Sequence, residues 1–375
     1  MKDMSGFLLS NEKYFWLCLK MIKGVGNNVF LSLINRFGSP KKVFNANIDE
    51  LLDTGIRKEL AYRIIKKEFL LDPDKEVRKL QVFGARLITF NDEEYPPLLK
   101  EIDYPPMILY AKGKPLPKDQ FFISIVGSRN ASSYGLRVAE DFSYKLAKIG
   151  IGIVSGMARG IDSFAHKGAL KAKGYTIAVL GTGIDIIYPK DNKNIFESIE
   201  KNGTIITEFP LGMHPEAKNF PIRNRIISGI SKGVLVIEAT KKSGSLITAS
   251  FALNQGREVF AIPGSIESIK SRGTHFLIKQ GAKLVEDVQD ILEEFGIRDV
   301  VEDHHHDNNK TASFDLNSKE QLIYKYISEY PVHIDEIIRN TGMDAPEVLS
   351  SLLKMELKGA VVQLPGRMYI RKIRG

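Results

Sequence analysis

The chain of 375 residues has a single cysteine, Cys18, and no long uninterrupted hydrophobic run. One thiol excludes an intramolecular disulfide and a zinc site built from several thiolates. No stretch approaches the roughly 18 consecutive apolar residues that a membrane-spanning helix requires. The apolar run FWLCL near the N-terminus is too short for the core of a secretory signal peptide. We therefore expect a protein without membrane spans that works in the reducing cytoplasm.

Acidic residues are fewer than basic ones. The sequence has 45 Asp and Glu against 53 Lys and Arg, a formal net charge of +8. An excess of positive charge favours a polyanionic partner such as a nucleic acid. Hydrophobic residues make up 43% of the chain, enough for a sizeable core, and the length predicts roughly two or three domains.

The outer parts of the chain differ from its middle. Apolar residues at helical spacing predict a helical N-terminal domain over 1–110. Its last part, 86–110, carries two Pro-Pro pairs, which we interpret as a stiff extended connector. The segment 298–318 is polar and has no hydrophobic period, as in a linker. Residues 319–375 show three helical segments and then two short β segments around a Pro-Gly turn, the pattern of a winged helix.

The middle segment, 111–297, alternates short apolar runs with helical stretches. Strands that are apolar on both faces and are each followed by a helix indicate an α/β fold with a parallel, doubly wound sheet. In such a sheet, ligands bind outside the carboxyl ends of the strands. The loops at those ends are therefore the places to look for a functional site.

Those loops are rich in glycine, hydroxyl groups and cations. Glycine lets the backbone approach a phosphate, and the free N–H groups of a helix N-terminus point at it. Taken singly, each of these residues could simply form a turn or cap a helix. Several such loops on one edge favour an anion site instead. The candidate residues are Gly127, Ser128, Arg129, Lys190, Lys241, Ser243, Gly244 and Ser245. Neither a complete dinucleotide-binding glycine pattern nor a P-loop occurs in the sequence.

The segment 218–225 gives the sharpest local signal. It surrounds one aromatic ring, Phe220, with the cations Lys218, Arg223 and Arg225. A nucleobase stacked on the ring, with the cations on the backbone phosphates, is a mode of single-strand binding that tolerates any sequence. The alternative is a hydrophobic staple at a helix start, with the arginines on a solvated face.

Catalytic and metal-binding residues are harder to find. His166 lies between an alanine and a lysine on a predicted helix, as a packed histidine would. Asp162 could cap that helix, and Glu208 and Glu238 could pair with the arginines just described. The triple histidine at 304–306 falls in the predicted linker, which provides no fixed ligand geometry. We therefore expect no catalytic residues, no metal site and no cofactor.

Several strings in the middle segment carry a family resemblance. SIVGSRNASSYG, IVSGMARGIDSFAHKGAL and NFPIRNRIISGIS are among those that follow one another through 121–285. With them the sequence resembles the DprA/Smf family, the DNA-processing proteins of bacterial natural transformation. The family's motifs fall here on Gly127, Ser128, Arg129, Lys190, Phe220, Arg223, Asn224 and Arg225.

The resemblance implies an extended Rossmann-like domain that binds single-stranded DNA. It implies a recombination mediator that protects incoming DNA and loads the RecA recombinase onto it. It also implies a homodimer formed through the sheet domain and no enzymatic activity. Members of the family often add a small N-terminal domain, likened to a sterile-alpha or helix-hairpin-helix unit, and a C-terminal winged helix.

Two other functions remain open at this stage. The same sheet edge could hold a small phosphate ligand in a nucleotide-processing enzyme, with Glu238 and the loop 243–245 as its site. The winged helix could instead serve a transcription regulator that prefers one duplex sequence.

Overall fold

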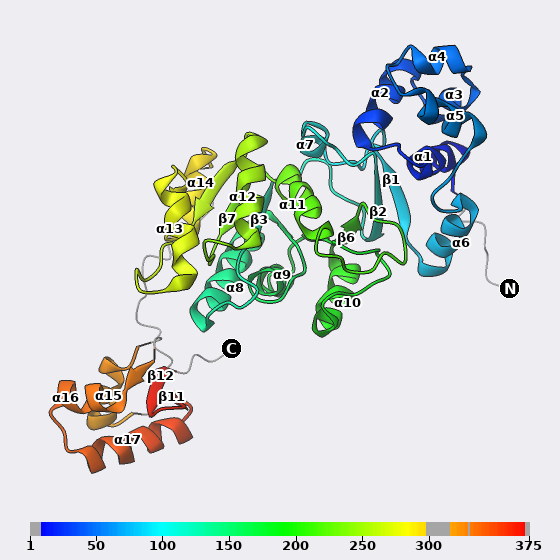
Figure 1. The fold of residues 1–375 in the computed structure, drawn as a ribbon. Helices are drawn as coiled ribbons and strands as arrows, with labels where there is room; N and C mark the ends of the chain where they lie inside the picture. The colour runs from blue at the N-terminus through cyan, green and yellow to red at the C-terminus, as the bar shows by residue number, and fades with distance from the viewer. Residues whose placement is uncertain (1–8, 298–315, 329–330, 372–375) are drawn as a thin grey trace. The chain divides into compact units, whose positions relative to one another are not determined.

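The computed structural model describes residues 9–297, 316–328 and 331–371. It divides into two compact units, Met1–Val300 and Val301–Gly375, each with its own core (Figure 1). No helix within the described ranges is long and apolar enough to cross a membrane.

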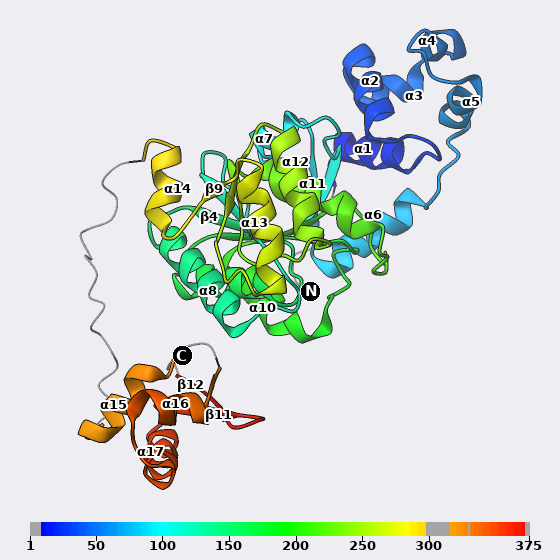
Figure 2. The same cartoon turned by 60° about the vertical axis from the view of Figure 1, so that its left-hand side comes forward.

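The first unit begins with a group of short helices, as the helical periodicity predicts. Trp16 stacks on Phe30 at a centroid distance of 5.1 Å inside this group, and Asn47 and Glu50 form a capping box. Both views show the first five helices gathered together (Figures 1 and 2). The helices are α1 (Asn11–Met21), α2 (Asn27–Phe37), α3 (Pro40–Asn45), α4 (Ile48–Leu52), α5 (Lys58–Lys66) and α6 (Pro73–Phe83).

A nine-stranded sheet forms the centre of the first unit, with the order β1-β2-β6-β5-β4-β3-β7-β8-β9. Strands β3 to β9 pair in parallel, which confirms the predicted doubly wound sheet. The strands are β1 (Arg86–Thr89), β2 (Ile108–Gly113), β3 (Phe122–Val126), β4 (Gly152–Ser155), β5 (Thr176–Val179), β6 (Thr204–Thr207), β7 (Gly233–Val236), β8 (Glu258–Ala261) and β9 (Lys283–Leu284).

Helices cover both faces of this sheet. On one face, α8, α9 and α14 share a core with Ile123, Ile125 and Leu235. On the other face, α7, α11, α12 and α13 pack against Val126 and Val234. The alternation follows from the period of two along each strand. These helices are α7 (Pro97–Lys100), α8 (Ser133–Lys148), α9 (Ile161–Lys171), α10 (Lys193–Asn202), α11 (Asn219–Ile230), α12 (Gly244–Asn254), α13 (Arg272–Lys279) and α14 (Val288–Glu294).

The expected connector over 86–110 is wrong. Strand β1 pairs antiparallel with β2, and β2 pairs antiparallel with β6, so this segment extends the sheet. Both Pro-Pro pairs lie between the two strands, where proline removes no hydrogen bond from the ladder. The N-terminal domain is therefore helical only as far as Phe83, and the sheet begins at Arg86.

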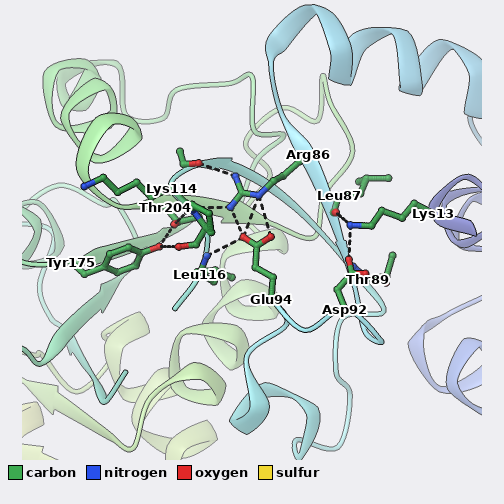
Figure 3. Close-up of polar contacts among 12 residues, drawn as sticks. Lys13, Arg86, Leu87, Thr89, Asp92, Glu94, Lys114, Leu116, Tyr175 and Thr204 are labelled. Atoms are coloured by element: carbon green, nitrogen blue, oxygen red, sulfur yellow. Dashed lines mark hydrogen bonds and ion pairs between the residues drawn. The ribbon is translucent and has the colours of Figure 1, made fainter. Parts of the chain in front are cut away.

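Arg86 of β1 ties the loop after β1 to the end of β2 (Figure 3). Its Nε donates to both carboxylate oxygens of Glu94, at 3.2 and 3.3 Å. Its terminal nitrogens donate to the carbonyls of Gly113 and Lys114 at 2.9 and 2.8 Å. Glu94 also accepts from the amide of Leu116 at 2.9 Å. A half-buried guanidinium with this many partners holds the loops in one arrangement.

The N-terminal helices are attached to the sheet by polar contacts as well. Lys13 of α1 pairs with Asp92 at 2.7 Å and donates to the carbonyl of Leu87 at 2.9 Å (Figure 3). On α6, the buried carboxylate of Glu76 accepts from the amide of Leu211 at 2.7 Å, in the loop after β6. Helix α6 is thus fixed beside the carboxyl end of a central strand.

The second unit is a winged helix, as predicted. Its strands form a small sheet in the order β10-β12-β11, and Ile323, Ile337 and Leu352 lie in its core. The predicted linker over 298–318 lies mostly outside the described residues. The elements are α15 (Ser318–Tyr326), β10 (Val332–His333), α16 (Ile334–Thr341), α17 (Ala345–Leu357), β11 (Val361–Leu364) and β12 (Met368–Arg371).

Candidate functional site

The carboxyl ends of the parallel strands form the edge at which the candidate site lies. The chain passes from β3 to β4 on one side and returns to β7 on the other side of β3. The strand order therefore reverses between β3 and β7. Open α/β sheets hold their ligands in the crevice at such a reversal.

Two adjoining hollows occupy this edge, and together we call them the trough. The first has a volume of about 680 Å³ and lies between the loop after β3 and the start of α12. The second has a volume of about 730 Å³ and lies over the loops after β4 and β5. The side chains that line both hollows include Arg129, Tyr188 and Phe220. Hollows of this size hold a nucleotide-sized group.

Phe220 stands at the junction of the two hollows. The guanidinium carbon of Arg129 lies 5.0 Å from the centre of its ring, and the ring of Tyr188 lies 5.7 Å away in a tilted arrangement. A Cβ at Gly181 would come within 2.9 Å of the Phe220 ring, so glycine there leaves space for it. The sequence thus correctly places Arg129 and Phe220 together.

Tyr188 is a site residue that the sequence reasoning missed. Its side chain is 42% exposed and lines both hollows. It provides an exposed aromatic surface beside the ring of Phe220. The sequence could have indicated Tyr188, because it stands only two positions before Lys190, which is a predicted contact. Lys190 itself is exposed and lines the second hollow, as predicted.

Arg223, a predicted phosphate contact, lines the first hollow but is largely buried. It is only 3% exposed, and its Nη1 donates to the carbonyls of Gly156, at 2.6 Å, and Val179. Gly156 directly follows β4, and Val179 is the last residue of β5. Arg223 therefore joins the ends of two neighbouring strands beneath the trough. Burial lowers the pKa of Arg223 to about 10. The group therefore stays cationic at neutral pH and lies 6.0 Å from the Phe220 ring centre.

Arg225 lies away from the trough, in contrast to its predicted contact with a phosphate. Its guanidinium forms a buried ion pair with Glu208, with side-chain exposures of 9% and 7%. Arg225 lines neither hollow. The pairing confirms the alternative that Glu208 meets an arginine of this motif. Burial lowers the pKa of Lys20, on α1, while Glu208 opposes that shift, so the pair faces the N-terminal helices.

Of the remaining predicted residues in and around the motif, Asn224 lines the trough, whereas Lys218 and Lys241 do not. Asn224 lines the first hollow, and its amide donates to the carbonyl of Gly244 at 3.3 Å. Lys218 pairs with Glu216 at 2.7 Å. Lys218 and Lys241 are both exposed, and neither lines a hollow. Both cations therefore lie at the margin of the site rather than within it.

The start of α12 forms one wall of the first hollow. Ser243 is the N-cap, and its hydroxyl lies 2.7 Å from that of Ser245. A Cβ at Gly244 would meet nothing within 4 Å, so packing does not explain glycine at that position. The Gly127-Ser128-Arg129 loop forms the opposite wall. Hydroxyls and helix N-terminal amides here are suited to an anionic ligand.

The candidate acid–base residues have structural partners. Glu238 accepts from the amide of Ser132 at 2.8 Å and from its hydroxyl, at the start of α8. Asp162 accepts from the amide of Ala158 at 3.3 Å. Burial raises the pKa of Asp162, and Arg223 opposes that rise. These bonds fix helix starts and loops around the trough.

His166 is packed, as the sequence indicates. Its Nδ1 lies 2.8 Å from the hydroxyl of Thr176, and burial lowers its pKa to about 3. It is therefore neutral at physiological pH. In the part of the chain that the structure describes, no group of three His, Cys, Asp or Glu could hold a metal ion. The triple histidine at 304–306 lies outside that part.

The exposed face of the winged-helix unit is apolar at one helix. Leu349, Leu353 and Leu357 recur every four positions along α17 and are all exposed. A helix that reads base edges presents polar and cationic side chains to the groove. Beside the leucines, α17 also exposes the polar Ser350 and the cationic Lys354.

Comparison with known proteins places the chain in a family. The family model described as DNA recombination-mediator protein A matches residues 86–296, and the model for the DprA winged helix domain matches residues 308–367. Protein Smf of Escherichia coli is 41% identical over 329 residues, which cover 86% of each chain. The DNA processing protein DprA of Streptococcus pneumoniae is 43% identical over 235 residues, 62% of this chain and 81% of the relative.

Solved structures agree with these relatives. The X-ray structure of DprA from Streptococcus pneumoniae matches with a TM-score of 0.65 at 36% identity, covering 76% of this chain and 98% of that one. A structure of DNA processing protein A from Helicobacter pylori, which concerns its single-stranded DNA binding mode, matches with a TM-score of 0.50 at 28% identity. It covers 56% of this chain and 95% of that one. By its sequence and its fold, the chain belongs to the DprA/Smf family of DNA recombination-mediator proteins.

Proposed function

We propose that the protein binds single-stranded DNA in the trough without sequence preference. The observation that carries the proposal is the gathering of Arg129, Lys190, Tyr188 and Phe220 around two adjoining hollows on one sheet edge. Cations at such a site neutralise phosphates, and aromatic rings stack on bases of any identity. Stacking contributes about 1–3 kcal/mol per base.

In this proposal the bound strand is the substrate of a recombination mediator. The protein receives a single strand, as in natural transformation, and loads the RecA recombinase onto it in the cytoplasm. The relative from Helicobacter pylori, whose structure concerns single-stranded DNA binding, supports the DNA part of the proposal. A trough open to solvent along the sheet edge suits this role, because the strand must remain accessible to the recombinase.

We further propose that the protein works by binding alone, without catalysis. The engagement of Glu208, Glu238 and Asp162 in structural contacts supports this. A nucleotide-processing enzyme of the alternative kind would need Glu238 free for acid–base work. Release of base or phosphate from mononucleotides, lost on Glu238→Gln, would favour the enzyme instead.

Homodimer formation through the sheet domain is the last part of the proposal. Four large apolar side chains are exposed in the segment that runs from the end of β8 to β9, the last strand of the sheet: Ile266, Ile269, Phe276 and Leu284. A patch of this kind suits association with a second copy. Sedimentation of wild type and Phe276→Glu tests this, and a wild-type monomer at micromolar concentration would refute it.

The DNA proposal is tested by a salt titration. Fluorescence anisotropy compares a labelled single strand with a duplex, using wild type and Arg129→Ala. For wild type, log K falls linearly with log salt, by about 0.7 per phosphate neutralised, and Arg129→Ala lowers that slope by about 0.7. Lys148→Ala, at the end of α8 on the opposite edge, serves as the control.

Two results would refute this proposal. One is affinity that does not respond to salt. The other is an Arg129→Ala variant that weakens binding to one sequence only, because stacking and phosphate contacts affect all sequences alike.

A further inference from the structure

A third hollow, which we call the α6 hollow, lies next to the trough and has no role so far. Its volume is about 480 Å³. It is formed by helix α6 and the loops that follow β5 and β6. Its lining residues are Lys75, Arg78, Lys79, Val82, Phe83, Asp185 and Leu211.

The topology places the α6 hollow on the same edge of the sheet as the trough. The first hollow lies at the ends of β7 and β3, the second at the ends of β4 and β5, and the third beyond β5 and β6. The loop after β5 joins the last two, since Thr182 lines the second hollow and Asp185 lines the third. Three residues span at most about 11 Å. The hollows therefore follow one another along a single line.

The outward charge of the α6 hollow is positive. Arg78 is exposed and has no ion pair within the described residues. Lys75 is exposed and meets Asp72 only at 4.0 Å. Lys79 lies 3.6 Å from the carboxylate of Glu76, which is itself buried.

The acidic residues at the hollow are engaged by backbone amides. Asp185 accepts from the amide of Gly212 at 2.8 Å, and Glu76 accepts from that of Leu211 at 2.7 Å. Three cations, Lys75, Arg78 and Lys79, line the hollow against one acid, Asp185, so its lining carries a net positive charge. This surface therefore attracts an anionic partner.

The α6 hollow also has apolar lining residues. They are the buried Leu211, the partly buried Phe83 and Val82, which is 90% exposed. Apolar and cationic side chains at one hollow match a nucleotide, whose base is apolar on its faces and whose phosphate is charged. Charge complementarity and continuity with the trough both favour a polynucleotide over a protein as the occupant.

We propose that the α6 hollow is a further contact region for the same DNA strand. A strand that leaves the second hollow beside Lys190 crosses the loop after β5 and sets its phosphates against Lys75 and Arg78. The site recognises the sugar-phosphate backbone, with Val82 as a contact for a base face. This inference rests on the proposed binding of single-stranded DNA in the trough.

The test compares two lengths of labelled single strand. The short strand is the shortest one whose binding depends on Arg129, so that it fills the trough alone, and the long strand extends well beyond it. The variant is Lys75→Ala with Arg78→Ala, which removes two exposed cations from α6. The control is Lys145→Ala with Lys148→Ala, which removes two exposed cations from the last turn of α8. The control removes the same number of charges as the variant, and Lys145 has an acidic neighbour, Asp141 at 2.7 Å, as Lys75 has Asp72 at 4.0 Å.

The expected result is a change on the long strand alone. Two lost phosphate contacts lower the slope of log K against log salt by about 1.4, since each contributes about 0.7 on a single strand. The variant keeps the wild-type slope on the short strand, and the control keeps it on both. Equal thermal midpoints for all proteins show that folding is unaffected.

Failure of this inference is separable from failure of the proposed function. If Arg129→Ala weakens both lengths while the α6 variant binds the long strand with the wild-type slope, the α6 hollow does not contact DNA and the trough still does. If wild type shows no salt-dependent binding to either length, both proposals are overturned.

Discussion

Separate replacements of Arg223 and Arg129 test two different roles, one in the stability of the fold and one in DNA binding. The sequence motifs alone do not distinguish these roles. Arg223 is buried and bonds two backbone carbonyls, whereas Arg129 is exposed over the Phe220 ring. We expect Arg223→Met to reduce the stability of the fold and Arg129→Ala to reduce DNA binding. The two variants should therefore fail in different assays.

The magnitudes follow from these contacts. A hydrogen bond from a charged group contributes about 1.5–3 kcal/mol, and a buried carbonyl left without a donor adds a desolvation cost. Loss of both bonds in Arg223→Met is expected to lower the free energy of unfolding by about 3–5 kcal/mol. Arg129→Ala loses an exposed cation–π contact, which contributes only about 0.5–1 kcal/mol.

Urea denaturation followed by circular dichroism measures the first effect, and the salt titration of single-strand binding measures the second. At low urea, folded Arg223→Met should keep the wild-type salt slope, because its guanidinium neutralises no phosphate directly. Arg223 would instead be a direct DNA contact if two results coincide: urea titration gives Arg223→Met a free energy of unfolding within about 1 kcal/mol of wild type, and the variant shows the same lowered salt slope as Arg129→Ala.

Three other predictions rest on buried or crowded positions. The folded-state pKa of His166, about 3, lies below its usual value of 6.5. As the pH falls below 6.5, only the unfolded state gains a proton at this residue. The free energy of unfolding therefore drops by about 1.4 kcal/mol per pH unit. His166→Phe should remove that pH dependence between pH 7 and 5 in urea titrations, and an unchanged slope would contradict the assignment. Arg225→Met alone should cost about 3–5 kcal/mol, and adding Glu208→Leu should restore most of it, because the unpaired buried charge is then gone. Gly181→Ala should displace the Phe220 ring, which a Cβ would approach to 2.9 Å, and weaken single-strand binding several-fold in anisotropy with little change in the thermal midpoint.

The sheet and its functional edge could be predicted because they depend on local pattern. Apolar runs such as the one ending at Val126 are buried on both faces, and each is followed by a helix. Once the strands are parallel, every loop after a strand falls on one edge, which is why Arg129 and Ser243 could be placed together without a structure. Their residue types then indicate an anionic ligand.

The depth of the arginines on α11 could not be predicted in the same way. An amphipathic helix reveals its buried face by its period, but α11 is buried along nearly its whole length, from Arg223 to Ile230. It lies between the sheet and α7 and is therefore enclosed on more than one side. A charged residue on such a helix looks solvated in the sequence although tertiary packing covers it.

The antiparallel extension was missed for a different reason. Its strands are only four and six residues long, and the segment between them is dominated by prolines. Short apolar runs are ambiguous when read alone. The partners that fix them, such as Arg86 with Glu94, lie close in sequence but carry no periodic signal.

The two arginines of α11 show how one motif serves both the trough and the N-terminal helices. Two positions along an α-helix correspond to a rotation of about 200°, so Arg223 and Arg225 point to opposite sides. Arg223 joins the ends of β4 and β5 under the trough, and Arg225 pairs with Glu208 on the side that faces Lys20. The helix that carries Phe220 is thus held from both directions. A helix held in this way requires less ordering when a base stacks on its aromatic ring, so in the proposed binding mode these buried arginines would position Phe220 while the exposed cations contact the strand.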